Sequence, residues 1–555
     1  MTYIENIIEL ALNHQRNGKI KRAKYLYNKI LEIDPKNSDA IHLLGMIEYS
    51  NHNYTLAINC IEKAIRLNPD IPDYHINLTS CYIATLNLVK AKQHALIAID
   101  LDHNLFKAYY NLGNILFAEG DIEGAIINYK KALNIKLDNQ SIWSNYLFAL
   151  NFLVGSNPES IFLENRKWGQ QIENKIKKHR KPFINRNRNH LRKIAYYLPE
   201  MDSHVTPRFI RPLLLNHDRT KFEILGYGYQ QNNSKENQQF IDQFTFWLDI
   251  KNLSTEKLVE RMREDKIDIL IHPCTFKSRY REILAHRPAP IQVANTNLVS
   301  TTGLKEVDFL VTDSTISPKE TSLNLYTEKL IYLSQVNTYQ ALENSPNVSE
   351  LPALKNNYIT FGSCNNIAKI NIEVIKTWSR ILNAIPNSKL LIKHRSLDNN
   401  LLKRRILFSF REFDIESERI VLEGFTPNPI DYLDVYNKID ISLDPFPFGG
   451  GTVSYESLWM GVPILTMLGE LFMGRLSGSL MKQVGLSNWI VNSQSDYISI
   501  AISFSTNLGE LGQIRQTLRQ QARLSIFDGV KYTREFESAL IKVWGNYIKN
   551  QKTGI

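Results

Sequence analysis

Residues 444–463 read DPFPFGGGTVSYESLWMGVP, with three consecutive glycines at 449–451. The preceding run, 439–443, has the composition of a buried strand, and a helical pattern follows the three glycines as far as Gly461. A parallel strand, a glycine loop and a helix start form an anion-binding turn, because the first amides of the helix point at the ligand and glycine lets the backbone approach a phosphate. Glu456, about one turn into the helix, is then placed to accept hydrogen bonds from ribose hydroxyls. An ordinary strand-to-helix turn has the same glycines, so the surrounding residues must decide between the two interpretations.

Two further segments accompany the glycine loop. Residues 361–370 read FGSCNNIAKI, and residues 286–293 read HRPAPIQV, with the triplet TTG at 301–303. Together these motifs resemble the SPINDLY and O-linked N-acetylglucosamine transferase family, whose members place tetratricopeptide (TPR) repeats before a glycosyltransferase of the GT-B type. The resemblance covers most of the chain. It implies an α-helical TPR superhelix followed by an α/β GT-B fold of two Rossmann-like lobes.

The first third of the chain contains internal repeats of 34 residues. Alanines recur at this interval in two sets, at 23, 57, 91 and 125 and at 64, 98 and 132. This period, with small residues where paired helices cross, is typical of TPR repeats. We expect about four repeats within residues 1–150, displaying a concave surface for protein or peptide acceptors. The alternative is an array that only supports the next domain.

Strand-like and helix-like runs alternate from residue 192 onward, which predicts parallel, doubly wound sheets. We expect a helical and basic linker at 151–190, an N-terminal Rossmann-like lobe at 191–350, and a C-terminal lobe at 351–555. The C-terminal lobe would hold the nucleotide-sugar site and the closing helices. The predicted strands lie at 194–198, 222–227, 267–271, 291–293, 309–311, 358–361, 389–392, 419–422, 439–443 and 463–466.

Composition narrows the class of protein. Lys and Arg number 66 against 56 Asp and Glu, a net charge of +10, which suits anionic phosphates or solubility. We expect no nucleic-acid partner, because no such motif stands out. The four cysteines are scattered without a CxxC pair, so neither a zinc site nor a disulfide framework is indicated. The N-terminus has no signal-peptide pattern and no apolar run reaches the length of a membrane span, so a cytoplasmic location is expected.

Lys369 is the foremost candidate for chemistry. A nucleotide-sugar reaction releases a diphosphate with growing negative charge, which fixed cations and amides must meet. The resemblance places Lys369 where the family has its phosphate-contacting lysine. A surface lysine at a helix start is the alternative, although a cation is slightly unfavourable there. Thr452 and the amides of Gly450 and Gly451 would complete the diphosphate site.

The resemblance also implies roles for other residues. His204, in the loop after the first strand, matches a family histidine near the donor phosphates and acceptor, and imidazole can act as a base at neutral pH. Tyr432 stands where relatives often have a histidine near the base, and it could stack on a nucleobase. Asn366 and Lys393 complete the predicted donor-binding set.

The resemblance implies an inverting, metal-independent glycosyltransferase that moves a sugar onto Ser or Thr hydroxyls of proteins, without cofactor or metal. UDP-GlcNAc is the expected donor, while GDP-fucose and UDP-glucose stay open as alternatives. The runs 272–277 and 297–300 depart from the family pattern on the acceptor side. A glycan acceptor, and a non-catalytic TPR scaffold with a decayed transferase domain, are therefore the competing hypotheses.

Overall fold

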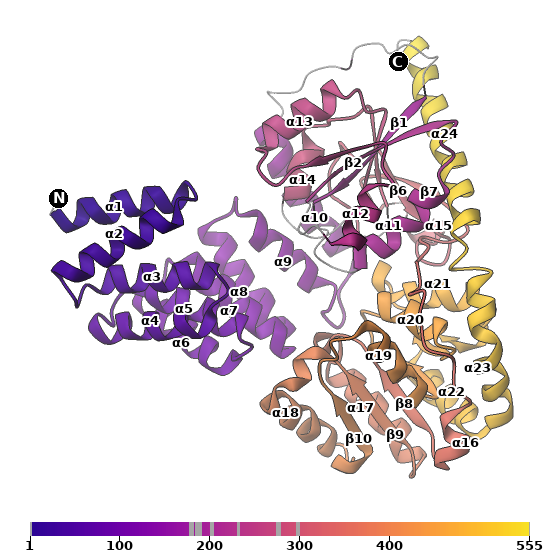
Figure 1. Ribbon diagram of the computed structural model, residues 1–555. Coiled ribbons are helices and arrows are strands. Elements are labelled where there is room, and N and C mark those ends of the chain that lie inside the picture. The colour runs from indigo at the N-terminus through magenta and orange to yellow at the C-terminus, as the bar shows by residue number, and fades with distance from the viewer. Residues whose placement is uncertain are drawn as a thin grey trace. The chain divides into compact units, whose positions relative to one another are not determined.

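The computed structural model describes residues 3–176, 183, 191–199, 205–229, 234–273, 279–295, 300–322 and 324–553. The chain forms two compact units, Met1–Ala149 and Leu150–Ile555 (Figure 1). The first unit is entirely helical in its described part, and the second holds both sheets. The predicted fold class, TPR repeats followed by two parallel α/β lobes of the GT-B kind, is confirmed.

Four consecutive helix pairs and a ninth helix build the first unit over its described residues. The helices are α1 (Tyr3–Arg16), α2 (Ile20–Ile33), α3 (Ser38–Ser50), α4 (Tyr54–Leu67), α5 (Pro72–Ala84), α6 (Leu88–Leu101), α7 (Phe106–Glu119), α8 (Ile122–Ile135) and α9 (Gln140–Leu150).

Small residues allow the paired helices of the repeats to approach closely. All seven alanines of the two 34-residue series are completely buried. A Cβ added to Gly113 of α7 would lie 2.6 Å from the ring of Tyr129 in α8, and one added to Gly45 of α3 would lie 2.9 Å from Ile61 in α4. The periodic small residues therefore set the helix spacing of each pair.

The first lobe of the second unit contains a parallel sheet with seven strands among the described residues, in the order β3-β2-β1-β4-β5-β6-β7. The strands are β1 (Arg192–Leu198), β2 (Phe222–Gly228), β3 (Phe246–Asp249), β4 (Ile269–His272), β5 (Ile291–Ala294), β6 (Phe309–Thr312) and β7 (Lys329–Tyr332). The helices are α10 (Pro158–Ile176), α11 (Val205–Asn216), α12 (Lys235–Ile241), α13 (Thr255–Glu264), α14 (Arg279–Ala285) and α15 (Lys319–Ser322).

The second lobe contains a parallel sheet with six strands in the described part, in the order β10-β9-β8-β11-β12-β13. The strands are β8 (Thr360–Ser363), β9 (Lys389–Lys393), β10 (Ile420–Glu423), β11 (Ile441–Leu443), β12 (Ile464–Met467) and β13 (Ile490–Val491). The helices are α16 (Pro352–Asn356), α17 (Ile372–Ala384), α18 (Asn400–Arg411), α19 (Pro429–Asp434), α20 (Thr452–Trp459), α21 (Leu476–Gln483), α22 (Gln494–Thr506), α23 (Leu508–Arg523) and α24 (Gly529–Thr553).

Helix α10, expected in a linker, packs on the first lobe. Arg166 donates a hydrogen bond to the Gly303 carbonyl at 2.6 Å, and Glu173 accepts one from the Lys305 amide at 2.6 Å. The helix also comes so close to the backbone at Gly303 that a Cβ on Gly169 would clash with the Gly303 carbonyl. The helical part of the expected linker is therefore integral to the lobe.

Helix α24, expected to close the second lobe, packs on the first lobe instead (Figure 1). Its apolar stripe, which includes Tyr532, Phe536 and Leu540, joins the core built by β1 and its neighbours. The buried carboxylate of Glu537 lies 2.9 Å from Nδ1 of His217. Burial of this stripe explains why the helix leaves the lobe that precedes it in the chain.

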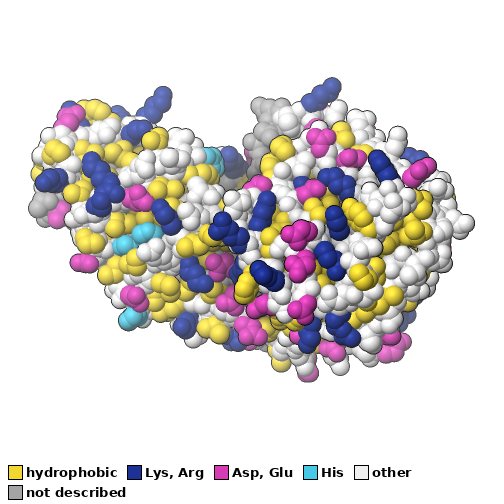
Figure 2. All heavy atoms as spheres, turned by 90° about the horizontal axis from the view of Figure 1, so that it is seen from below, with side chains coloured by type: hydrophobic (Ala, Val, Ile, Leu, Met, Phe, Trp, Pro, Cys, Tyr) yellow, Lys and Arg dark blue, Asp and Glu magenta, His cyan; other side chains and the backbone are white. Residues whose placement is uncertain are grey.

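Charged side chains of both signs are interspersed over the face of the molecule shown in Figure 2. The Lys and Arg side chains on that face therefore lie among Asp and Glu side chains. Among the described residues, no helix has the length and apolarity needed to cross a membrane.

Candidate functional site

The two motif loops of the second lobe follow neighbouring strands. β11 pairs with β8 in parallel, with Ile441 opposite Phe361 and Ser442 opposite Gly362. The carboxyl ends of the two strands therefore lie side by side, and the chain order changes direction between them. Such a switch point is where open α/β sheets bind ligands. The fold brings the lysine motif and the glycine loop together there.

Lys369 contacts the glycine loop directly. Its Nζ donates hydrogen bonds to the Gly449 carbonyl at 2.6 Å and to Asn365 Oδ1 at 3.1 Å. The ammonium also lies 4.4 Å from the centre of the Phe448 ring. Burial lowers the pKa of Lys369 to about 8, and the nearby Asp444 carboxylate acts in the opposite direction. The group is thus a partly desolvated cation at the start of the loop.

Asp444 shapes the loop from inside. Its Oδ1 accepts a hydrogen bond from the Gly450 amide at 2.6 Å, and its Oδ2 accepts one from the Thr466 hydroxyl at 2.8 Å. A Cβ on Gly450 would lie 2.0 Å from Ser454 Oγ. The sequence predicts that the Gly450 amide binds a diphosphate, whereas in the structure this amide donates to Asp444. Gly450 is instead required by the packing of the loop itself.

The first turn of α20 supplies the other amides. The described residues offer no hydrogen-bond acceptor for the amides of Gly451, Thr452 and Val453, as is usual where a helix begins. A Cβ on Gly451 would meet only the Met473 methyl group, at 3.9 Å. An anion could therefore reach the backbone amides of Gly451 and Thr452.

Glu456 lies in a polar cluster between the two lobes. Its Oε1 is 3.5 Å from the Tyr339 hydroxyl and 3.7 Å from Nη1 of Arg208, on helix α11 of the first lobe. The Tyr432 hydroxyl is a further hydrogen-bond partner. Burial raises the pKa of Glu456 to about 7, and Arg208 and the tyrosine hydroxyls act against that rise. The carboxylate therefore titrates near neutral pH.

Two other predicted residues have structural partners of their own. Lys393, buried at the end of β9, donates hydrogen bonds to the Gly424 carbonyl at 2.7 Å and to the Thr426 hydroxyl at 2.6 Å. Asn366 is exposed and caps the short helical turn 367–369, accepting from the Ala368 amide at 3.0 Å. Their donor-binding roles stay predictions.

Some predicted residues lie outside the described part of the chain. His204 is one of them, as are residues 274–277 and 297–299 of the two runs that depart from the family pattern. His272, the first residue of the earlier run, is completely buried at the end of β4, and burial lowers its pKa to about 3. It is therefore a neutral core residue at physiological pH.

A family model described as glycosyl transferase family 41 matches residues 167–341 and 347–536. The chain belongs to this family. A tetratricopeptide repeat model matches residues 38–71 and 106–139 within the repeat unit.

The relatives of this family 41 chain include plant proteins. It is 31% identical over 428 residues to a probable UDP-N-acetylglucosamine–peptide N-acetylglucosaminyltransferase SPINDLY of Oryza sativa subsp. japonica, with 76% of this chain and 46% of that protein covered. It is 28% identical over 384 residues to the corresponding SEC protein of Arabidopsis thaliana, covering 65% and 38%. The chain thus spans less than half the length of these relatives.

Among solved structures, it is similar to a lysine-to-methionine mutant of the Thermobaculum terrenum O-GlcNAc transferase. The TM-score is 0.79 at 28% identity, with 99% of this chain and 100% of that chain covered.

Several groups that complete the site of this family 41 member lie outside the set predicted from its sequence. The side chain of Asn365, next to the predicted Asn366, accepts a hydrogen bond from the Lys369 ammonium. Arg208 and Tyr339 come from outside the motifs and meet Glu456 only through the packing of the lobes. Asp444 and Glu456 are the only two charged residues in 444–463. The position of Asp444, directly after the predicted strand, could therefore have indicated a role in the loop.

Proposed function

We propose that the chain is an inverting, metal-independent glycosyltransferase that transfers GlcNAc from UDP-GlcNAc to Ser or Thr hydroxyls of proteins. The observation that carries the proposal is the contact between the Lys369 ammonium and the Gly449 carbonyl, at 2.6 Å. It fixes a partly buried cation at a loop whose following amides have no protein acceptor among the described residues. This arrangement suits a leaving diphosphate.

The reaction needs one bond made and one broken. The acceptor oxygen attacks the anomeric carbon on the face opposite the diphosphate, and the carbon–oxygen bond to the diphosphate breaks. The bonding electrons go to the diphosphate oxygen, where Lys369 and the amides of Gly451 and Thr452 meet the developing charge. The hydroxyl proton passes to a base, for which His204 is the candidate from sequence.

The nucleoside part of the donor would lie one turn further along α20, at Glu456. Glu456 would accept hydrogen bonds from the ribose hydroxyls, and Tyr432, on α19, would pack against the base. The names of the relatives support UDP-GlcNAc over GDP-fucose and UDP-glucose. Acceptor proteins would be recruited by the TPR unit.

A donor screen tests the proposal. The full chain is incubated with UDP-GlcNAc, UDP-glucose and GDP-fucose, and nucleotide release is measured with and without a mixture of proteins rich in Ser and Thr. Mass spectrometry then identifies any added sugar and the residue that carries it. We expect a HexNAc mass increment on Ser or Thr from UDP-GlcNAc. Nucleotide binding without transfer from any donor would instead support a non-catalytic scaffold.

A further inference from the structure

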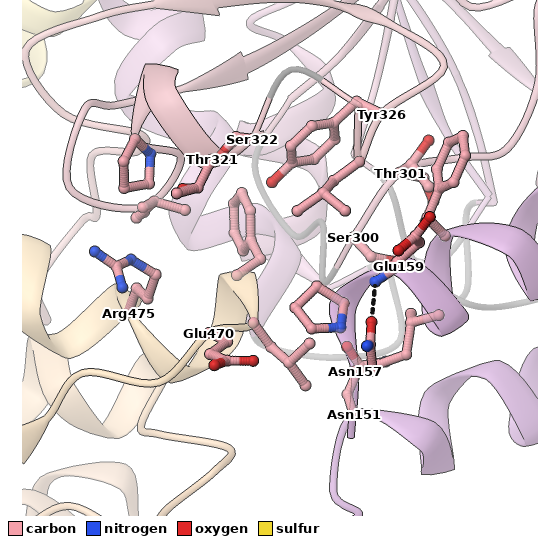
Figure 3. Close-up of a pocket in the computed structure, with 18 residues that line it drawn as sticks. Asn151, Asn157, Glu159, Ser300, Thr301, Thr321, Ser322, Tyr326, Glu470 and Arg475 are labelled. Atoms are coloured by element: carbon pink, nitrogen blue, oxygen red, sulfur yellow. Dashed lines mark hydrogen bonds between the residues drawn. The ribbon is translucent and has the colours of Figure 1, made fainter. Parts of the chain in front are cut away.

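A cavity of about 430 Å³ lies within the 150–555 unit (Figure 3). Its walls come from the chain segment that opens α10, from residues 300–326 of the first lobe, and from the turn at 470–475 of the second lobe. None of the residues predicted to bind the donor lines it.

The cavity adjoins the glycine loop through a single turn of the chain. The Gly449 amide donates a hydrogen bond to the Met473 carbonyl at 3.2 Å, and Gly449 is the residue that Lys369 contacts. Phe472, the neighbour of Met473, and Arg475 line the cavity. The cavity is therefore next to the point where the donor diphosphate would lie.

The walls combine apolar surface with hydroxyl groups. Ile161, Phe162, Leu325 and Phe472 give apolar contact area. Ser322 is only 5% exposed and lines the cavity, and its hydroxyl has no hydrogen-bond partner in the part of the chain that the structure describes. A hydroxyl at the cavity surface can donate a hydrogen bond to a ligand and accept one from it.

Two carboxylates and one cation line the cavity, so its charge is negative on balance. Glu159 and Glu470 are exposed and form no ion pair with any described residue. Glu159 sits in the first turn of α10, where a carboxylate is favoured by the helix dipole. Arg475 also lines the cavity and keeps its positive charge, while its Nε and Nη1 are held by the carbonyls of Thr315 at 2.7 Å and Gly469 at 2.8 Å.

We propose that this cavity is an acceptor subsite that selects polypeptides with a lysine or arginine close in sequence to the modified hydroxyl. The inference rests on the proposed function. The aliphatic stem of such a side chain would pack on the apolar walls while its charged end reaches Glu159 and Glu470. A polypeptide backbone would at the same time offer hydrogen-bond partners to Ser322.

Peptide binding to the full chain tests the subsite without requiring transfer. Labelled Ser-containing peptides that differ only in Lys, Gln or Glu at each flanking position are titrated by fluorescence anisotropy in the presence of UDP. We expect the best Lys peptide to bind more tightly than its Gln counterpart, by about two- to fivefold for each carboxylate engaged. The Glu159→Gln/Glu470→Gln double variant should lose this difference.

Three controls sharpen the test. Glu412→Gln alters an exposed acid at the end of α18, outside the cavity lining, and should keep the preference. Glu470→Lys should abolish the preference for the Lys peptide, because the introduced ammonium offsets the charge of Glu159. Thr321→Trp, at an exposed position of the wall, should weaken every peptide while UDP affinity stays that of the wild type.

The outcomes separate this inference from the proposed function. Equal affinity of the wild type for Lys and Gln peptides, or a preference that survives in the double variant, overturns the subsite. Charge-dependent binding without sugar transfer from any donor leaves the subsite standing and refutes the proposed function. Sugar transfer that does not depend on peptide charge supports the proposed function and refutes the subsite.

Discussion

Nη1 of Arg208, on α11 of the first lobe, lies 3.7 Å from Oε1 of Glu456, on α20 of the second lobe. Tyr339 joins the pair, since Arg208 donates a hydrogen bond to its hydroxyl at 2.9 Å. The acid that would hold the ribose is thus influenced by a cation from the opposite lobe. Donor affinity should therefore depend on how the two lobes meet.

Arg208→Met should shift the pH dependence of donor binding. If ionised Glu456 accepts the ribose hydrogen bonds, donor affinity falls as the pH drops through the Glu456 pKa of about 7. Removing a nearby cation raises the pKa of a carboxyl, so the midpoint of this fall should move up by about one pH unit. Calorimetric titration with UDP-GlcNAc across the neutral range measures the midpoint. Arg211→Met, on the same helix, is the matched control, and an unmoved midpoint in Arg208→Met would refute the role.

Lys369→Ala should abolish transfer while the fold stays intact. The loss of one preorganised contact to the leaving group costs on the order of 3–4 kcal/mol in the barrier. Because only the ammonium form meets the diphosphate, wild-type donor affinity should also fall as the pH rises through the Lys369 pKa of about 8. Steady-state kinetics and titrations measure both effects. Lys376→Ala, an exposed lysine of α17, should behave as the wild type; near-normal turnover in Lys369→Ala would remove Lys369 from the mechanism.

Substitutions at Gly450 and Gly451 should separate packing from binding. Gly450→Ala places a methyl group 2.0 Å from Ser454 Oγ and should cost about 1–3 kcal/mol of stability. Gly451→Ala has room within the protein, so its melting temperature should be unchanged. UDP affinity in Gly451→Ala should fall on the order of tenfold, the worth of one hydrogen bond to a charged group. Wild-type UDP affinity in Gly451→Ala would place the diphosphate elsewhere.

Removing residues 1–104 should impair the use of protein acceptors only. The cut falls between α6 and α7, so no helix is interrupted. Nucleotide release from the donor and modification of short peptides should persist, because their groups lie in the 150–555 unit. The kcat/KM for folded protein acceptors should drop on the order of tenfold or more, as the second attachment is lost. Equal labelling of the same proteins by the shortened chain would deny the repeats a recruiting role.

Phe536→Ala should destabilise the first lobe from the far end of the chain. Phe536 is completely buried in that lobe's core, and truncation of a buried phenylalanine costs about 3–5 kcal/mol. Urea unfolding of the full chain, followed by tryptophan fluorescence, measures the loss. Lys542→Ala, on an exposed face of the same helix, should change stability by less than about 0.5 kcal/mol.

The repeat unit and the glycine loop could be predicted from sequence. The 34-residue alanine series and the run of glycines at 449–451 each have one dominant structural interpretation. β3, β7 and β13 are absent from the predicted strands, because each has at most four residues and at most one of them is buried. Short strands leave too few residues for a periodic signal.

The contacts of the site could be predicted only where both partners lie in loops that carry a sequence motif. Lys369 and Gly449 come together because their loops follow paired strands, and both loops carry glycine or asparagine signals. The meeting of Arg208 with Glu456 depends on two lobes docking, for which local sequence holds no signal. The internal role of Gly450 depends in the same way on where Asp444 points.

The position of α24 also constrains how the protein is made. Domains fold as they leave the ribosome, from the N-terminus onward, at about 5–20 residues per second. The last strand of the first lobe, β7, ends at Tyr332, and the helix that completes its core begins at Gly529. Roughly 200 residues separate them, so the nascent first lobe waits about 10–40 s with an apolar face uncovered. That interval is when chaperones have a surface to bind, and truncation near the C-terminus would make it permanent.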